Sequence, residues 1–561
     1  MKTILKFLIL GFLTSTLIFG GIVYYIKERP SSETVDPISY FNEFSNDYMN
    51  ITLEDIRIDL VEPVLLKDNT IYISSEFANM YVDDAIFYDN VENILTITNL
   101  SEIRRFNINE DTYTINGVET PTDIVIYEHN SLVYIPETYL ERNYPIEFKL
   151  GNDKRIVVSN DLQFSKSLAN VTYNKAVIRT HPDKKKPSLD TARLDSIVEI
   201  YGVELDYYRV RNENGMIGYI RQKDVDIVGQ STTQSKLVYT SHPLNKPLNE
   251  RVRLVWDQMT AQAVHEFSDY KYENISDINV ISPTWFEFID ETGKLSNRCS
   301  KTYVSAAHSK GIQVWALMSH NFTNPQWTRE ILTSTQKRQY VIEQLIDYAQ
   351  EYNFDGINID IENVSEDFSN EWVQFMRELY PQAGLKGLCV SVDVYIPSNW
   401  SKHYMRDKIS EVVDYFIVMA YDEHWSGSEV AGSVASLPWV EEGIILNLEE
   451  VTNEKLVLGI PFFNRIWAET DTGLETLAIS MYEAQYRLQN AEVIPTYDLA
   501  TGLNYAEYNQ SNKLYKIWLE DIHAISKRVE LIEEYNLAGY AGWKLGLETP
   551  DIWTELAKMD K

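Results

Sequence analysis

The sequence predicts a multidomain protein with an N-terminal transmembrane helix, an α+β repeat domain, a small β-barrel and a C-terminal (β/α)8 TIM barrel. Three observations lead to this architecture. The chain begins with a long apolar run, repeats a strand-forming segment, and then alternates apolar strand-like runs with helical stretches. At 561 residues, the chain is long enough for about three domains, each with its own core.

The composition is that of a globular protein with an acidic balance. Hydrophobic residues make up 44% and charged residues 24% of the chain, and the formal net charge is −33 at pH 7. Such an excess of negative charge repels phosphate backbones, so we expect no nucleic-acid partner. The two cysteines, Cys299 and Cys389, lie far apart, and no two histidines have the i,i+4 spacing of a zinc helix. We therefore expect no metal and no other cofactor.

Residues 1–30 are the predicted transmembrane segment. Lys2 and Lys6 precede an almost uncharged run over residues 7–26, which has about the 20 residues that a helix needs to cross a bilayer. No A-x-A cleavage pattern follows, so the sequence favours an uncleaved signal anchor over a cleaved signal peptide. The rest of the chain would then lie outside the cytoplasm. Residues 31–51 form a predicted polar stalk.

Residues 52–160 contain an internal repeat. Residues 70–77 resemble residues 132–139, and each segment is followed by a second short apolar strand. The Asn116-Gly117 pair between them is a tight-turn signal, so the pattern predicts two similar strand–helix–strand units. It resembles the copper amine oxidase N-terminal-like domain. That resemblance implies binding or spacing, and without a histidine cluster it implies no copper.

Residues 169–228 are predicted to form a small barrel of short strands separated by turn residues. The predicted strands are Val177–Arg179, Ile197–Tyr201, Tyr207–Arg211 and Gly218–Arg221. Their order resembles bacterial SH3-like domains, many of which bind peptidoglycan. The tyrosines of these strands fit either a binding face or the barrel core. Residues 229–236 are a predicted linker.

Residues 237–561 are long enough for a (β/α)8 barrel. Its predicted strands are Asp277–Ser282, Gln313–Leu317, Gly356–Ile361, Leu388–Val394, Tyr415–Ala420, Lys455–Ile460 and Gly539–Trp543. Apolar residues at helical spacing predict a helix over Arg338–Tyr352. This helix leads directly into the most informative segment of the chain.

That segment, residues 354–362, reads Phe-Asp-Gly-Ile-Asn-Ile-Asp-Ile-Glu. Side chains alternate between the two faces of a strand, so Asn358, Asp360 and Glu362 would share one face. Three polar groups on one face are costly unless that face meets a substrate or a hydrogen-bond network. Glu362 lies where the strand should end, and functional groups collect at the C-terminal ends of barrel strands.

The nonapeptide resembles the signature of glycoside hydrolase family 18, the chitinase-like (β/α)8 enzymes. Other segments resemble later strands of that family in the same order: Met419–Asp422, Leu458–Pro461 and Tyr540–Trp543. The phrases Ser282–Trp285 and Tyr421–Trp425 are similar to the branch that contains spore-germination and cortex-lytic N-acetylglucosaminidases. The resemblance covers about the last 320 residues of the chain.

The resemblance implies a role for each matching residue. Glu362 would be the acid and then the base, and Asp360 would orient the substrate's acetamido group. Tyr421 would hydrogen-bond the acetamido oxygen. The implied substrate-binding residues are Asn358, Asp422, Met419, Trp543, Trp285 and Trp425. Asp355 and Gly356 would give structural support, and no residue would bind a metal.

The resemblance implies a retaining glycosidase that uses the substrate's own acetamide and cuts β-1,4 bonds after N-acetylglucosamine in peptidoglycan. The target would be spore cortex during germination or cell wall during remodelling. The enzyme would be a monomer, held by its N-terminal helix in a bacterial membrane at the cell wall or spore envelope, or secreted if that helix is cleaved.

Two alternatives remain open from the sequence. One is a chitinase or chitooligosaccharide hydrolase, and the other is a non-catalytic wall-binding lectin on the same barrel. Retention of Glu362, Asp360 and Tyr421 favours an enzyme. Asn358 departs from the family pattern, because many chitinases carry Asp there. An amide can donate a hydrogen bond to Asp360 but cannot share a proton with it. The sequence therefore does not predict the pH optimum.

Overall fold

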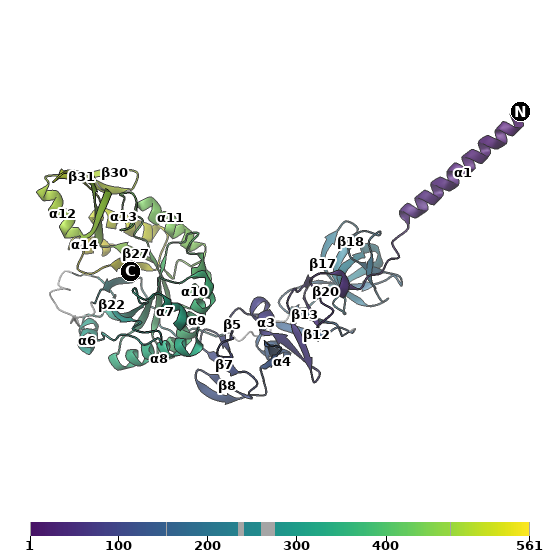
Figure 1. Ribbon diagram of the computed structural model, residues 1–561, viewed down its shortest axis with the longest axis horizontal. Helices are drawn as coiled ribbons and strands as arrows, with labels where there is room; N and C mark the ends of the chain where they lie inside the picture. The colour runs from purple at the N-terminus through teal and green to yellow at the C-terminus, as the bar shows by residue number, and fades with distance from the viewer. Residues whose placement is uncertain are drawn as a thin grey trace. The chain divides into compact units, whose positions relative to one another are not determined.

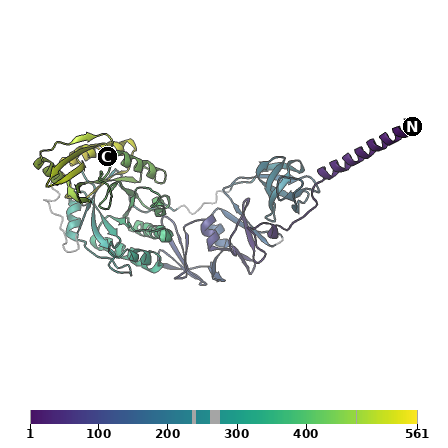
Figure 2. The same ribbon diagram turned by 45° about the horizontal axis from the view of Figure 1, so that its top comes forward.

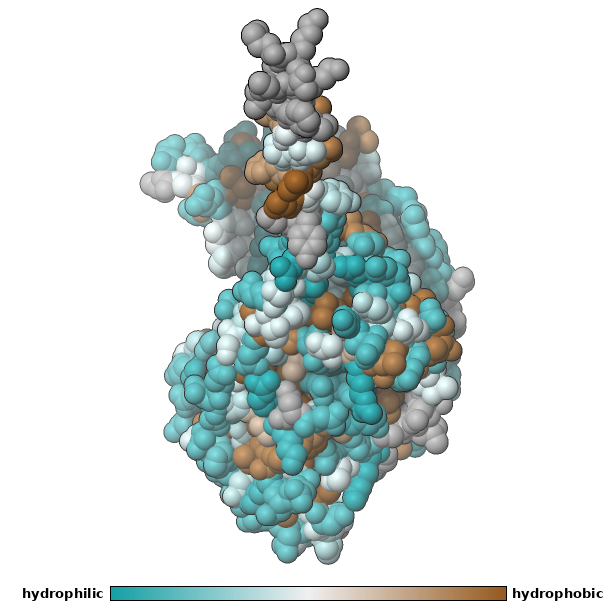
Figure 3. Space-filling model, turned by 90° about the vertical axis from the view of Figure 1, so that its right-hand side faces the viewer, coloured by the Kyte–Doolittle hydropathy of each residue, from teal (hydrophilic) through white to brown (hydrophobic). Residues whose placement is uncertain are grey.

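The computed structural model describes residues 2–152, 154–233, 241–259, 275, 277–471 and 473–559, and the side chains of 2–10 and 25–27 are not described. The chain divides into two compact units. The N-terminal unit holds residues 1–87, 106–113 and 120–240, and the barrel unit holds residues 88–105, 114–119 and 241–561 (Figure 1). The face of the molecule in Figure 3 is mostly hydrophilic, with scattered apolar residues.

Helix α1, Lys2–Glu28, coincides with the predicted transmembrane segment and runs as one continuous helix (Figure 2). Within the described part of the chain, however, no helix combines the length and the apolar character needed to cross a membrane. The prediction of a transmembrane helix over residues 1–30 is therefore not supported. The predicted stalk begins after α1 and contains the short helix α2, Pro37–Tyr40.

The strand and the helix of each predicted repeat unit are present, whereas the predicted second strands lie in two different sheets. Strand β4 and helix α3 form the first unit, and β11 and α4 form the second. The two strands pair antiparallel in a sheet of order β10-β11-β4-β3. Ser74 starts α3 by accepting a hydrogen bond from the Phe77 amide at 3.2 Å. Pro136 precedes α4 at the equivalent place, where its fixed φ suits a helix start.

The strands and helices of this segment have the following bounds: β1 Asn50–Leu53, β2 Ile56–Arg57, β3 Val64–Lys67, β4 Thr70–Ser74, α3 Ser75–Tyr81, β5 Ile86–Asp89, β6 Ile94–Thr98, β7 Ile103–Asn107, β8 Thr112–Ile115, β9 Val118–Pro121, β10 Tyr127–His129, β11 Leu132–Pro136, α4 Glu137–Asn143, β12 Ile146–Leu150 and β13 Ile156–Asp161. Sheets β12-β13-β1-β2 and β5-β6-β7-β8-β9 complete it. Asn116 and Gly117 both have positive φ, at 49° and 79°, and form the predicted tight turn between β8 and β9.

The predicted small barrel is a seven-stranded antiparallel sheet of order β16-β15-β19-β18-β17-β14-β20. Its elements are β14 Ser167–Val171, β15 Val177–Arg179, β16 Ser188–Thr191, β17 Ile197–Glu204, β18 Tyr207–Arg211, β19 Ile217–Arg221, the 3-10 turn η1 Gln222–Asp224 and β20 Val225–Gln230. All four predicted strands are present. Tyr207 is buried and Tyr208 packs against the core, which favours the core role for these two tyrosines. The predicted linker begins inside β20, and its residues 234–236 lie outside the described residues.

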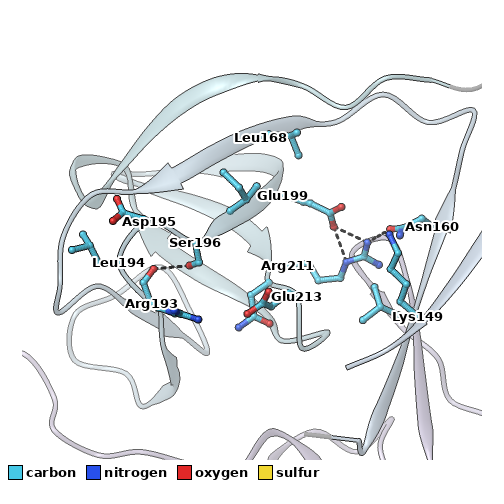
Figure 4. A pocket seen from close by; sticks show the side chains of 13 residues that line it. Lys149, Asn160, Leu168, Arg193, Leu194, Asp195, Ser196, Glu199, Arg211 and Glu213 are labelled. Carbon is cyan, nitrogen blue, oxygen red and sulfur yellow. Dashed lines mark hydrogen bonds and ion pairs between the residues drawn. The ribbon is translucent and has the colours of Figure 1, made fainter. Parts of the chain in front are cut away.

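A polar cavity of about 660 Å³ lies in the N-terminal unit (Figure 4). Its only fully buried cation, among the residues that line it, is Arg211. The Arg211 Nη2 atom lies 2.6 Å from Glu199 Oε2, and its Nη1 donates to the Ser159 carbonyl at 2.9 Å. These partners neutralise the buried charge, so the Arg211 guanidinium does not face the cavity as an unpaired cation.

The second half of the chain forms a closed, all-parallel eight-stranded barrel of order β21-β22-β23-β24-β25-β26-β27-β33. Its strands are β21 Val252–Asp257, β22 Val280–Glu287, β23 Gln313–Ser319, β24 Gly356–Asp360, β25 Cys389–Tyr395, β26 Tyr415–Met419, β27 Leu456–Pro461 and β33 Gly539–Trp543. The seven predicted strands are confirmed, although β22 begins later and runs further than predicted. Strand β21 was not predicted, because arginines interrupt its apolar pattern.

Helices cover the outside of the barrel (Figure 1). They are α6 Lys301–Ser309, α7 Gln326–Leu332, α8 Thr335–Tyr352, α9 Ser369–Gly384, α10 Arg406–Glu411, α11 Leu437–Leu448, α13 Ile522–Glu534 and α14 Ile552–Leu556, with 3-10 turns η2 Glu366–Phe368 and η3 Lys402–Tyr404. Helix α8 contains the predicted helix. Ser334 caps it by accepting from the Lys337 amide at 3.2 Å, and Asn353 ends it with a left-handed φ of 62°.

An additional sheet is inserted between β27 and β33. Its order is β29-β28-β32-β31-β30, and α12, Met481–Asn490, packs against it. The strands are β28 Phe463–Thr470, β29 Gly473–Ser480, β30 Thr496–Asp498, β31 Leu503–Gln510 and β32 Lys513–Leu519. Figure 2 shows this sheet in yellow-green at one end of the barrel unit.

Residues 88–105 belong to the barrel unit although they fall within the predicted 52–160 domain. The Asp89 carboxylate accepts hydrogen bonds from the Thr335 amide at 3.0 Å and from its hydroxyl at 2.7 Å. Arg105 lies 3.1 Å from the Glu378 carboxylate on α9. This segment is therefore bonded to the start of α8 and to α9.

Candidate active site

Strand β24 carries the nonapeptide and follows the predicted alternation. Ile357 and Ile359 are fully buried in the cluster between the barrel and its helices, while Asn358 and Asp360 occupy the other face. The strand ends at Asp360, which places Glu362 at the C-terminal end of the barrel. Gly356 starts the strand where a Cβ atom would lie 2.6 Å from the Trp315 ring, so only glycine fits there.

Three hydrogen bonds hold Glu362. Its carboxylate oxygen Oε2 accepts a very short bond from the Tyr395 hydroxyl. Its carbonyl accepts from the Tyr404 hydroxyl at 2.6 Å, and its amide donates to His320 Nδ1 at 3.3 Å. Burial lowers the pKa of His320 to about 4, so the ring is neutral near pH 7 and can accept this bond.

The carboxyl group of Glu362 has a raised pKa. Burial is the main cause, and the negative charge of Asp422 adds to it, while the hydrogen bond from Tyr395 acts in the opposite direction. A raised pKa keeps more of the group protonated near neutral pH, which is the state that a general acid needs.

Asp360 is 9% exposed, and its Oδ1 atom is buried. Among the described residues, this oxygen has no hydrogen-bond partner. Burial raises the pKa of Asp360 well above its usual range, and the neighbouring carboxylates Glu362 and Asp393 raise it further. A buried acceptor without a partner is costly, so the site is built to receive a donor at this atom.

The end of β26 and the segment after it bring Met419, Tyr421 and Asp422 to the same place. Together with Glu362 they line a cavity of about 690 Å³. Asp422 has a left-handed φ of 62°, and its Oδ1 accepts from Arg465 Nη2 at 3.1 Å. Strained backbone of this kind persists where its surroundings hold it, and here the Arg465 contact does so.

Aromatic side chains form much of the rest of the cavity wall. Trp425 and Trp400 are 56% and 60% exposed, and Tyr395 and Trp439 also line the cavity. The Trp400 ring lies 5.1 Å from the Tyr395 ring. Large apolar ring faces beside a few fixed polar groups suit the faces of sugar rings. The prediction that Trp425 lies at the site is therefore consistent with this cavity.

The structure corrects the expectation for Trp285. This side chain is 1% exposed and packs against Tyr303 and Phe354, with ring centroids at 5.4 and 6.3 Å. The ladder between β22 and β23 is irregular between Thr284 and Phe286, so the strand does not keep a simple alternation there. Trp285 is a core residue and cannot contact a sugar.

Asn358 is likewise fully buried and supports the site without reaching the cavity. Its side-chain oxygen accepts from Trp256 Nε1 at 2.9 Å and from the Ser282 hydroxyl at 3.0 Å. Its amide nitrogen donates to the Ser391 hydroxyl at 3.0 Å and to Asp393 Oδ1 at 2.8 Å. The expectation that Asn358 binds substrate is corrected to a role inside the barrel.

Two other predicted residues lie at the edges of the site. Trp543 ends β33, and its ring meets Trp256 edge-on at 5.7 Å, outside the wall of the 690 Å³ cavity. Asp355 precedes β24, where its Oδ2 accepts from the Val314 amide and pairs with His308 Nε2, both at 2.8 Å. Through these two contacts Asp355 joins the start of β24 to β23 and to α6.

The sequence pattern did not predict four residues of the site: Asp393, Tyr395, Trp400 and His320. A signal for the first two was present, because Ser391, Asp393 and Tyr395 alternate with valines in the same way as the nonapeptide. Trp400 and His320 lie beyond strand ends and carry no such pattern. Within the described ranges, no group of three or more histidine, cysteine or acidic side chains is placed to hold a metal ion.

Comparison with known proteins now identifies the domain. Residues 319–548 match the model for glycosyl hydrolases family 18. This part of the chain is similar to the family 18 glycoside hydrolases. The chain is 24% identical over 297 residues to the uncharacterized glycosylase YvbX of Bacillus subtilis, a match that covers 51% of this chain and 85% of that protein.

Two further relatives have names that refer to the spore cortex. The chain is 25% identical over 238 residues to the cortical fragment-lytic enzyme of Bacillus subtilis, covering 41% of this chain and 55% of the relative. The chain therefore spans about half the length of that enzyme. The structure of the Bacillus megaterium spore cortex-lytic enzyme SleL aligns with a TM-score of 0.50 and 18% identity, over 62% of this chain and 79% of that one. This last likeness is one of fold.

Proposed function

We propose that this protein is a retaining, substrate-assisted glycosidase that hydrolyses β-1,4 bonds after N-acetylglucosamine in bacterial peptidoglycan. The observation that carries the proposal is the placement of Glu362 on the wall of the cavity, with Asp360 two residues earlier on the same face of the strand. In the described part of the chain, no cation is paired to either carboxyl. Such an arrangement suits one protonated acid and one hydrogen-bond acceptor side by side.

In the proposed mechanism, protonated Glu362 donates its proton to the leaving glycosidic oxygen. The carbonyl oxygen of the substrate's own N-acetyl group attacks the anomeric carbon, so the enzyme needs no second carboxylate as nucleophile. The Oδ1 atom of Asp360, which has no partner among the described residues, would accept the acetamide N–H and stabilise the positive charge that develops there. Glu362, now ionised, would then take a proton from water as it opens the intermediate.

Tyr421 and Asp422 would complete the sugar site. The Tyr421 hydroxyl is kept protonated, because burial and the neighbouring carboxylates raise its pKa well above its usual value. It can therefore donate to the acetamide oxygen. Trp400 and Trp425 would contact the faces of the polymer outside the reacting sugar.

Support for peptidoglycan as the substrate comes from the cortical fragment-lytic relative and from the predicted wall-associated domains upstream. Peptidoglycan lies outside the cytoplasm, so the proposal places the protein there. Chitin also contains N-acetylglucosamine and would reach the same groups, so a test must compare the two polymers.

The test incubates the full chain with purified spore cortex, vegetative cell wall and chitin, and identifies the products by mass. We expect fragments that end in reducing N-acetylglucosamine from cortex or wall, and little from chitin. Release from chitin alone would replace the proposal with a chitinase. Binding to all three polymers without product would instead indicate a lectin.

A further inference from the structure

A second carboxylate lies beside Asp360 on the neighbouring strand. Asp393 belongs to β25 and is 2% exposed. The barrel ladder pairs Asn358 with Ser391 and Ile359 with Val392, so the next positions in register are 360 and 393. Side chains two residues apart share a face, which puts Asp360, at the end of β24, beside Asp393, within β25.

The orientation of Asn358 fixes Asp393. The indole Nε1 of Trp256 can only donate, so the atom of Asn358 that it meets at 2.9 Å must be the oxygen. The amide nitrogen therefore faces Asp393 and donates to its Oδ1 at 2.8 Å. The Oδ1 atom of Asp393 is therefore engaged as an acceptor.

We propose that Asp393 is a positioning residue for Asp360, and that the two carboxyl groups hold one proton between them. This inference rests on the proposed function and names a group that the sequence motif does not contain. The amide at 358 cannot share a proton, and the structure supplies a carboxyl from the next strand in its place.

Sharing a proton explains how two buried carboxyl groups coexist without a cation. Two adjacent carboxylates cannot both ionise at low cost in a buried site, and a pair with one proton carries a single charge. As the acetamide becomes positively charged, the negative charge of the pair is needed on Asp360, so the proton resides on Asp393. When product leaves, the proton redistributes within the pair, and no donor outside the pair is consumed.

The titratable groups that face Asp393 come from both neighbouring strands. Asp360 and Glu362 lie at the end of β24, and Tyr421 follows β26. Burial raises the pKa of Asp393 well above its usual range, and the hydrogen bond from Asn358 opposes that rise. Within the described residues, no lysine or arginine contributes to either pKa.

The test compares Asp393→Asn with the exchange Asn358→Asp/Asp393→Asn in the full chain. The assay follows release of reducing sugar from purified cortex between pH 3 and 9. In Asp393→Asn, the single carboxyl loses the stabilisation of a shared proton. We expect kcat to fall about 100-fold, since small misplacements at a reacting centre cost this much. KM should stay nearly unchanged, and the acid limb of the profile should move to lower pH, because Asp393 no longer raises the pKa of Asp360.

The variant Asn358→Asp/Asp393→Asn places a second carboxyl on the face of β24 that carries Asp360. It also keeps the hydrogen bonds from Trp256 and Ser282, because an Asp side chain at position 358 can accept both. We expect it to recover kcat at least about tenfold over Asp393→Asn and to return the acid limb toward the original pH. The matched control is Asp414→Asn, which removes a charge from a buried Asp at the opposite end of β26. It should lower thermal stability and leave the pH profile in place.

An unchanged kcat and pH profile in Asp393→Asn would overturn the inference. So would an exchange variant as impaired as Asp393→Asn, because packing and not a second carboxyl would then be what Asp393 supplies. Glu362→Gln keeps these outcomes separate from the proposed function. If Glu362→Gln retains activity, the proposed function fails; if it is inactive while Asp393→Asn behaves as the parent chain does, only the role of Asp393 fails.

Discussion

Two groups of buried carboxylates in the barrel unit differ in their partners. Glu378 on α9 is fully buried and pairs with Arg338 at 3.0 Å and Arg105 at 3.1 Å. Burial favours its neutral form, but the two arginines outweigh burial and hold the pKa of Glu378 below its usual value. At the end of β24, no cation accompanies Asp360 and its neighbours in the described chain, and burial raises their pKa values.

The difference separates a structural carboxylate from a reactive one. The two arginines hold the pKa of Glu378 below its usual value, and Glu378 joins α8 to α9 through Arg338. The pKa values of Asp360 and Glu362 are raised instead, which costs stability and would supply the acid and the acceptor of the proposed reaction. Changes that remove one member of each group should therefore have opposite consequences.

The largest effect is expected from Glu362→Gln. The amide cannot donate a proton to the leaving oxygen, so kcat should fall by about 10³-fold or more. Thermal unfolding should stay close to that of the parent chain, because the amide fills the same space. Reducing-sugar release and scanning calorimetry measure the two quantities. The control is Glu366→Gln, because Glu366 is an exposed carboxylate shortly after β24. Equal losses of kcat in the two variants would show that Glu362 is not the general acid.

Glu378→Gln should show the reverse pattern. It leaves Arg338 buried without its counter-charge, and breaking a buried pair by removing one partner costs about 3–5 kcal/mol. Chemical denaturation followed by tryptophan fluorescence would measure the loss. Activity per folded molecule should be retained. Replacing both partners, with Arg338→Met/Glu378→Leu, should recover most of the stability, and a double variant as unstable as the single one would contradict the ion-pair explanation.

The pH dependence of stability should distinguish the two groups again. The pKa of Asp360 is raised by folding, so its contribution is fully present below its unfolded value of about 3.9 and is lost as pH rises through the folded value. The pKa of Glu378 is lowered, so its contribution is present above about 4.3 and is lost as pH falls.

Asp360→Asn should therefore raise the unfolding temperature at pH 7 and have little effect at pH 3, whereas Glu378→Gln should lower it at pH 7 and lose that effect toward acid. Calorimetry across this range measures both. If both variants shift the unfolding temperature at pH 7 in the same direction, the proposed difference between Asp360 and Glu378 is wrong.

The sequence predicts the reactive end of β24 well and its surroundings poorly. The alternation of residues 357–362 is local, so it places Asp360 and Glu362 on one face whatever the rest of the chain does. Asp393 carries the same alternation, but its meaning depends on which strand lies beside it in the barrel. That register is a long-range property, and the pairing of Asn358 with Ser391 fixes it only in the folded chain.

Local irregularity explains the other differences. Trp285 lies at a break in the ladder between β22 and β23, which no residue pattern announces. Strand β21 has Arg251 and Arg253 in and before its apolar run, and these obscure the pattern of a buried strand. Arg253 is 4% exposed and donates to the Asp277 carbonyl at 2.6 Å, so its charge is satisfied inside the fold.

The smallest effect is expected at the rim of the cavity. Trp425 is 56% exposed, and a Cβ atom added to Gly427 would lie 2.4 Å from its ring, so the glycine leaves room for the indole. If Trp425 contacts the polymer by its ring face, Trp425→Ala should raise KM about tenfold, roughly 1.4 kcal/mol, with kcat almost unchanged. Steady-state kinetics on solubilised cortex would measure this.

Leu499→Ala is the matched truncation, because Leu499 is 87% exposed and does not line the cavity. It should leave KM as it is. An unchanged KM in Trp425→Ala would mean that the polymer does not use this wall. Substrate binding would then come from Asp360, Tyr421 and Asp422 alone, at the reacting sugar. The exposed tryptophan would be an ordinary surface residue.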